Sequence, residues 1–167
     1  MIAGIVLAAG AATRFGEPKQ RLLLPRVLAR LEETSVLDEI VVVAGAYELD
    51  ALGARVITCP EWDRGPGASL RCGLAALSSD VEAAVVCLAD GPNLSHEAVE
   101  RVVAGWRGAD RDVVAASYGG KRGHPVAIGR GAWDSVPDEG MRSVRATLIA
   151  CDDLGPPGDV DRPEDLE

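Results

Sequence analysis

Aromatic residues are scarce in this chain of 167 residues, at 4%. Its core therefore has to be built mainly from Val, Leu, Ile and Ala, which suits buried parallel strands better than a β-sandwich. Apolar residues make up 47% and charged residues 26%, which argues against intrinsic disorder over most of the length. A chain of this size is expected to form one domain, residues 1–167.

Basic residues are fewer than acidic residues. The chain has 17 Lys and Arg against 26 Asp and Glu, a net charge of −9. An acidic surface repels phosphate backbones, so we expect no nucleic-acid partner. An anionic ligand would then need a local cluster of basic residues, or metal ions held by carboxylates.

The cysteine pattern lacks a metal or redox motif. No C-x-x-C pair is present among the four cysteines, which argues against a zinc site or a thioredoxin-like motif. No charged-then-apolar leader and no apolar run of transmembrane length is found either. We therefore expect a reducing cytoplasm as the compartment and no membrane partner. The cysteines are Cys59, Cys72, Cys87 and Cys151.

Short apolar runs alternate with helical patterns along the chain. Most runs are continuous and β-branched, as expected for strands covered on both faces. Helix periodicity marks 24–31, 69–77 and 95–106, the last with Ser95 as its cap. The alternation predicts an α/β fold, a single-domain three-layer α/β/α sandwich around a mostly parallel twisted sheet. The expected strands are 2–8, 39–44, 54–59, 83–89, 112–116 and 125–128.

In such sheets, ligands bind beyond the carboxyl ends of the strands. The first of these loops follows residues 2–8 and combines small residues and Gly10 with two cations, Arg14 and Lys19. Backbone N–H groups in such a turn can hold a phosphate. The spacing matches neither a P-loop nor a dinucleotide fingerprint. Composition alone leaves an ordinary strand-to-helix turn equally possible. The other loops considered are 60–68, 90–95, 118–124 and 152–161.

Residues 7–19 resemble the signature L-A-A-G-x-x-x-R-x-G-x-x-K of the MobA-like nucleotidyltransferases of the GT-A type, and are most similar to the molybdenum cofactor cytidylyltransferases. Five further elements follow in the family's order. The resemblance implies the Rossmann-like fold of nucleotide-diphospho-sugar transferases. The five elements are Trp62–Leu74 (W-x-x-G-x-x-x-S-L-x-x-G-L), Leu88–Pro92 (L-A-D-x-P), Gly123–Val126 (G-H-P-V), Asp138–Arg142 (G-D-x-G-A-R) and Asp159–Leu166 (D-I-D-T-P-E-D-L).

The resemblance implies transfer of a nucleoside monophosphate from a triphosphate to a small phosphorylated acceptor, with Mg²⁺ as cofactor. Catalysis of this kind rests on positioning and charge neutralisation. Arg14 would bind the β- and γ-phosphates, and Lys19 would stabilise the charge on the α-phosphate. Asp90 would bind the metal together with Asp159 or Asp161, although Asp161 could instead cap a last helix. The implied nucleotide-binding residues are Leu7, Ala8, Ala9, Gly10, Arg14, Lys19, Gly65 and Ser69.

The resemblance implies that the acceptor, a phosphorylated pterin, binds at the basic loop that contains Lys121, Arg122 and His124. The residues alone leave a hairpin turn with solvated charges equally possible, and Arg142 is a weaker candidate for the same duty. In the family, the sequence L-A-A-G, here residues 7–10, is found in enzymes that transfer a cytidylyl group. CTP is therefore the expected donor.

Some features depart from the family pattern. The loops after Gln20, Gly45 and Arg142 have fewer residues than the family pattern leads one to expect. Gly91 also stands where the cytidylyltransferases carry Gln. Transfer to a sugar phosphate, or a non-catalytic relative that binds nucleotide or cofactor, therefore remain alternatives. An oxidoreductase role has no dinucleotide fingerprint to support it. Without an obvious exposed apolar patch, a monomer or weak dimer is expected.

Overall fold

A computed structural model describes residues 1–10, 19–49 and 53–158, except the side chains of residues 19 and 20. The described chain forms one seven-stranded sheet with the order β3-β2-β1-β4-β6-β5-β7. Strand β6 is antiparallel to both of its neighbours, and the other pairings are parallel. The strands are β1 (Ile2–Ala8), β2 (Glu39–Ala44), β3 (Arg55–Thr58), β4 (Ala83–Leu88), β5 (Val113–Tyr118), β6 (Lys121–Gly129) and β7 (Thr147–Ala150).

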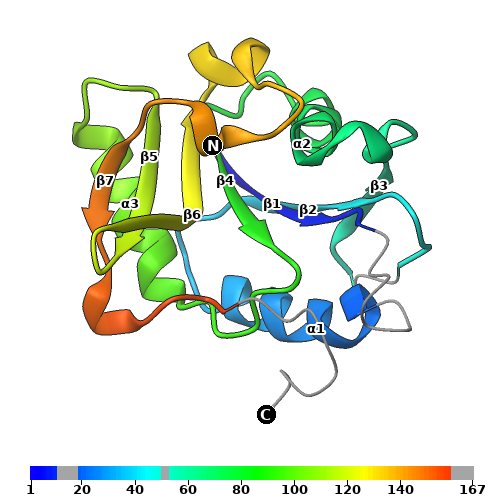
Figure 1. Cartoon of the computed structure of the whole chain (residues 1–167), viewed down its shortest axis with the longest axis horizontal. Coiled ribbons are helices and arrows are strands. Elements are labelled where there is room, and N and C mark those ends of the chain that lie inside the picture. The colour runs from blue at the N-terminus through cyan, green and yellow to red at the C-terminus, as the bar shows by residue number, and fades with distance from the viewer. Residues whose placement is uncertain (11–18, 50–52, 159–167) are drawn as a thin grey trace.

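Among the described residues, three α-helices cover the sheet and complete the expected α/β/α layers (Figure 1). Helices α1 (Lys19–Glu32) and α3 (His96–Gly108) pack on one face, and α2 (Pro66–Ala75) packs on the other. Helix α3 begins as predicted, because the Ser95 hydroxyl accepts a hydrogen bond from the Glu97 N–H at 3.2 Å. Its buried face contains Val99, Val102 and Val103, three residues of the predicted stripe.

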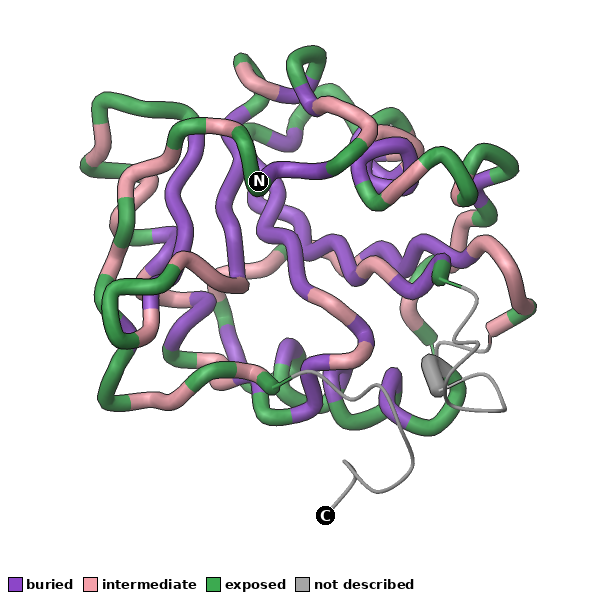
Figure 2. The backbone as a smooth tube through the Cα atoms, viewed as in Figure 1, coloured by how far each residue is buried: buried purple, intermediate pink, exposed green. Residues whose placement is uncertain are grey.

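Both faces of the central strands are buried, as the continuous apolar runs predicted (Figure 2). Side chains alternate between two cores along β1, with Val6 toward α1 and α3 and Ile5 toward α2. Leu7 in β1 and Leu88 in β4 are the residues of these two strands that are only partly buried. They stand at the carboxyl ends, where the site lies.

The structure decides between the two possibilities that the residues left open for 118–124. The segment is a tight hairpin in which β5 ends at Tyr118 and β6 begins at Lys121, so the strand expected at 125–128 starts four residues earlier. Gly119 and Gly120 form its two-residue turn with φ of 59° and 79°, the left-handed conformation that such turns require. Arg122 and His124 therefore lie on a strand.

The cysteines fall into two pairs of different kinds. Cys59 and Cys72 form a disulfide that joins the chain after β3 to α2, with the Cα atoms 5.8 Å apart. A spacing of 13 residues carries no motif, so the sequence did not indicate this bond. Cys87 and Cys151 are buried thiols, and burial raises the pKa of Cys87 to about 12. No described helix is long and apolar enough to cross a membrane.

Candidate active site

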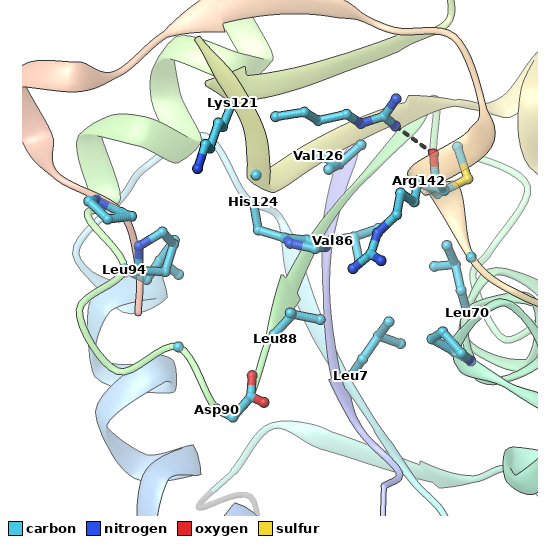
Figure 3. A pocket seen from close by; sticks show the side chains of 18 of the residues that line it. Leu7, Leu70, Val86, Leu88, Asp90, Leu94, Lys121, His124, Val126 and Arg142 are labelled. Atoms are coloured by element: carbon cyan, nitrogen blue, oxygen red, sulfur yellow. Dashed lines mark hydrogen bonds between the residues drawn. The ribbon is translucent and has the colours of Figure 1, made fainter. Parts of the chain in front are cut away.

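A cavity of about 1010 Å³ opens at the carboxyl ends of β1 and β4. This is the edge at which parallel sheets bind ligands. Figure 3 shows its apolar floor, formed by Leu7, Val86 and Leu88 of the sheet together with Leu70 of α2 and Val126 of β6. Apolar walls of this kind exclude water and suit the uncharged part of a ligand.

Charged and polar side chains stand around this floor. Lys121, His124 and Arg142 enter the cavity from β6 and the chain before β7, whereas Asp90 enters from the opposite side, directly after β4 (Figure 3). A ligand that contains both phosphates and a ring system would find Lys121 and Arg142 on one side, where Glu139 also lines the cavity, and Asp90 on the other. The structure thus brings together the expected metal residue Asp90 and the expected acceptor residues.

His124 is held as a neutral group. Burial lowers its pKa to about 4, the Asp90 charge acts in the opposite direction, and Arg122 and Arg142 lower the pKa further. The Tyr118 hydroxyl donates a hydrogen bond to the His124 carbonyl oxygen at 2.7 Å and so fixes the backbone there. Burial also raises the pKa of Tyr118. At neutral pH, His124 can therefore donate or accept a hydrogen bond but adds no charge.

Arg122 also lines the cavity, but its guanidinium is engaged with the protein. Its Nη2 donates to the Met141 carbonyl oxygen at 2.7 Å, and its Nη1 donates to the Val144 carbonyl oxygen. Burial lowers the pKa of this guanidinium, which nevertheless stays charged at neutral pH because an arginine pKa is so high. Arg122 thus connects β6 to the chain that carries Arg142.

The turn before α2 is packed against another part of the chain. The Gly67 N–H donates to the Asp138 carbonyl oxygen at 2.8 Å, and a Cβ on Gly65 or Gly67 would overlap the backbone of residues 137–138. Gly65 itself has a φ of 134°. Ser69 is 3% exposed, and neither it nor Gly65 lines the cavity, whereas Pro66 and Leu70 do. These glycines therefore allow close packing of two protein segments.

Two arginines reinforce this packing through Asp138. Arg71 donates to the Asp138 carboxylate, and the Arg64 Nη2 lies 3.2 Å from the other oxygen of that carboxylate. The hydrogen bond from Arg71 is the main cause that lowers the pKa of Asp138. The network holds residues 136–138 against the amino-terminal end of α2.

The end of the described chain packs against the residues that follow Asp90. The Asn93 N–H donates to the Pro157 carbonyl oxygen at 2.9 Å, and a Cβ on Gly91 would lie 3.0 Å from the Pro157 Cβ. Residues 156–158 line the cavity. Asp159 and Asp161 follow directly but lie outside the described residues. Within the described ranges, no group of three or more His, Cys, Asp or Glu side chains could hold a metal ion.

The first loop is described only in part. Leu7 lines the cavity, while Ala8 and Ala9 are buried behind it and Gly10 is exposed. The Ala9 carbonyl oxygen accepts a hydrogen bond from the Ala46 N–H at 3.2 Å. Arg14 and the Lys19 side chain lie outside the described part of the structure.

Sequence reasoning missed several lining residues. Tyr118 and Leu94 contribute side chains to the walls, and so do residues 139–141 and 143 on either side of Arg142. The sequence did contain a signal for part of this set, since Asp138–Arg142 matched one of the family elements. Tyr118 and Leu94 lie in the loops 118–124 and 90–95 that were considered, but no motif singled them out, because only the folded chain brings their side chains to the cavity.

Comparisons with known proteins agree with this fold. A homolog of Mycobacterium tuberculosis Rv0371c from Mycobacterium sp. strain JC1 is 27% identical, with a TM-score of 0.79 over 98% of this chain and 92% of that chain. Rv0371c of M. tuberculosis H37Rv in complex with manganese is 22% identical, with a TM-score of 0.67 over 99% of this chain and 92% of that chain. A CMP:2-keto-3-deoxy-manno-octonic acid synthetase complexed with CTP is 14% identical, with a TM-score of 0.74 over 99% of this chain and 95% of that chain.

A search among curated proteins found no match. The family model of the MobA-like NTP transferase domain matches residues 4–151. This match contains most of the first strand and every residue that lines the cavity except Pro156, Pro157 and Gly158. The chain belongs to the MobA-like NTP transferase family.

Proposed function

We propose that this MobA-like nucleotidyltransferase transfers CMP from CTP to molybdopterin, a small phosphorylated acceptor, and releases pyrophosphate. The observation that carries the proposal is the cavity beyond β1 and β4, with its apolar floor, its cations and Asp90. An oxygen of the acceptor phosphate attacks the α-phosphorus of CTP. The bond from that phosphorus to the pyrophosphate oxygen breaks, and the electron pair leaves with pyrophosphate.

The nucleotide would bind at the end of β1. Backbone groups of residues 8–10 would face the base and phosphates, with Leu7 at the base and ribose. Gly65 and Ser69, which the motif resemblance also assigns to the nucleotide, do not line the cavity and would act only by shaping the turn before α2. Arg14 and Lys19 would neutralise the phosphates, as the motif resemblance implies. The L-A-A-G spelling supports CTP over GTP, and one structural neighbour was solved with CTP bound.

The proposed cofactor is Mg²⁺, held by Asp90 with Asp159 or Asp161. Hard oxygen donors such as carboxylates suit this ion, which usually takes one or two of them and completes its shell with water and substrate phosphates. The packing of residues 157–158 on Gly91 supports this pairing, because it brings the chain before Asp159 next to Asp90. A neighbour contains manganese. The ion would neutralise charge at the α-phosphate.

The acceptor would occupy the other side of the cavity. Lys121 and Arg142 would meet its phosphate, and neutral His124 would hydrogen-bond to it. Arg122 adds positive charge to the same wall. A flat heteroaromatic ring fits the apolar floor of Leu7, Leu88 and Val126 better than a ring covered with hydroxyls, whose hydrogen bonds would be lost there.

Pyrophosphate release tests the proposal. Purified protein with Mg²⁺, CTP and molybdopterin should release pyrophosphate, whereas GTP should support at most a small fraction of that rate. Thermal unfolding with CTP, GTP, ATP and UTP should show a Mg²⁺-dependent shift for CTP. Ligand at about 100 times its Kd adds roughly 2.7 kcal/mol, or about 5–10 °C here. A chain that no nucleotide stabilises would contradict the proposal.

A sugar phosphate is the second candidate acceptor, favoured by the structural likeness to the CMP:2-keto-3-deoxy-manno-octonic acid synthetase. Pyrophosphate release with sugar phosphates but not with molybdopterin would favour it. We also propose a monomeric or weakly dimeric protein in the cytoplasm. The Cys59–Cys72 disulfide would then be an exception to the reduced state of most cytoplasmic cysteines.

A further inference from the structure

Residues 136–144, here called the strap, run between α2 and β6 and are hydrogen-bonded to both. The strap follows the 3-10 helix Arg130–Ser135 and contains the short 3-10 turn Met141–Ser143. Five consecutive residues, 139–143, line the cavity, Arg142 among them. The position of the strap therefore decides where the Arg142 guanidinium lies.

Two arginines from outside the strap hold it on opposite sides. Arg71 of α2 donates to the Val136 carbonyl oxygen at 2.7 Å and to the Asp138 carboxylate. Arg122 of β6 donates to the carbonyl oxygens of Met141 and Val144, which flank Arg142 in the sequence. The side that carries Arg142 is thus fixed by Arg122.

We propose that Arg122 is a positioning residue for the acceptor, which it serves by holding the strap so that Arg142 points into the cavity. This inference rests on the proposed function and assigns Arg122 a role through Arg142. Both Nη atoms of Arg122 are committed to strap carbonyls, so Arg122 keeps its hydrogen bonds only while the strap stays in place.

The role requires arginine. A planar guanidinium presents several donors in a rigid fork and can bridge two carbonyl oxygens at once. A lysine keeps the charge but concentrates its donors on one nitrogen at the end of a flexible chain. Arg122→Lys therefore separates the geometric role from the contribution of charge.

A matched control lies directly after the other end of β6. Arg130 donates to the carbonyl oxygens of Val81 and Ser78, at 2.8 and 2.7 Å, and so makes the same kind of double contact. It does not line the cavity. Arg130 begins the 3-10 helix Arg130–Ser135 that precedes the strap, and its guanidinium lies over the Trp133 ring at 4.1 Å. Arg130→Lys should therefore reproduce any loss of stability around the start of the strap while leaving the Arg122 contacts to Met141 and Val144 in place.

Hydrogen exchange measured by mass spectrometry reports on the strap without any ligand. In Arg122→Lys, we expect amides of residues 139–146 to exchange about tenfold faster or more, the effect of losing one hydrogen bond to a charged group. In Arg130→Lys these amides should exchange as in the wild type. Unchanged strap exchange in Arg122→Lys would overturn the proposal, whether or not the wild type turns over molybdopterin.

Kinetics test whether Arg122 acts through Arg142. With CTP and molybdopterin, Arg122→Lys should raise the KM for molybdopterin about tenfold and change the KM for CTP less than twofold. In an Arg142→Ala background the same change should add less than twofold, because the two residues form one unit. If Arg122→Lys instead raises the KM by the same factor with and without Arg142→Ala, Arg122 contacts the acceptor itself and the proposal is overturned. Absence of turnover in the wild type would refute the proposed acceptor, and the exchange result would still decide the role of Arg122.

Discussion

Replacing Gly67 by Ala should weaken the contact between α2 and the strap. A Cβ at this position would lie 2.7 Å from the Pro137 carbonyl carbon and would overlap its oxygen. One of the two backbones must therefore move, and the hydrogen bond from the Gly67 N–H to Asp138 must lengthen. The effect arises from packing within the protein, because Gly67 does not line the cavity.

The magnitude follows from three contributions. Overpacking costs about 1–3 kcal/mol, and the weakened hydrogen bond costs up to about 1 kcal/mol more. The higher helix propensity of Ala offsets up to about 1 kcal/mol of this loss. The net destabilisation should be about 1–3 kcal/mol, which lowers Tm by roughly 3–10 °C for a chain of this length.

Thermal and urea unfolding of the ligand-free protein provide the assay. The matched control is Gly108→Ala at the end of α3, where an added Cβ meets nothing within 4 Å. Its Tm should be unchanged or slightly raised. If Gly67→Ala unfolds within 1 °C of the wild type, the packing explanation is refuted, and a loss of nucleotide binding in that stable variant would assign Gly67 to the ligand.

Three further outcomes are expected. Because the folded pKa of His124 is about 4 and the unfolded value is near 6.5, the unfolded state binds the extra proton between these values. The free energy of unfolding should therefore fall by about 2–3 kcal/mol as pH drops from 6.5 to 4. Urea unfolding in EDTA should show a smaller fall in His124→Gln, and an equal dependence on pH in the wild type and the variant would contradict this prediction. Reduction of the Cys59–Cys72 bond by a dithiol should lower stability by about 3 kcal/mol, the loop entropy for a separation of 13 residues; a Cys59→Ser/Cys72→Ser variant as stable as the oxidised wild type would refute this. Asp90→Asn should abolish Mg²⁺-dependent pyrophosphate release while Tm without metal changes by less than about 2 °C, and a variant with normal turnover would remove Asp90 from the proposed metal site.

The elements of the fold could be predicted from the sequence because their signals are local. Each expected strand is present, and β2 has the expected bounds, 39–44. The buried stripe and Ser95 cap of α3 depend on neighbours three or four residues apart, which a periodic pattern reveals. The ordered motifs predicted the family for the same reason, since each is a short run of residues.

The candidate site could be predicted only in part. Asp90, Lys121 and His124 were expected from motifs and do line one cavity. The hairpin at Gly119–Gly120 was considered but could not be chosen over a loop, because Gly pairs occur in both. Arg14, Asp159 and Asp161 lie outside the described residues and stay predictions.

Local patterns of apolar residues were enough to predict the layers and the edge of the sheet at which the cavity lies, and short ordered motifs were enough to predict the family. Tertiary structure decided the partners: Cys59 with Cys72, Gly67 with Asp138, and Arg122 with the carbonyl groups beside Arg142. These pairs join segments 13 to 71 residues apart in the chain. Which distant groups meet depends on how the whole sheet and its helices pack, and no local pattern encodes that meeting.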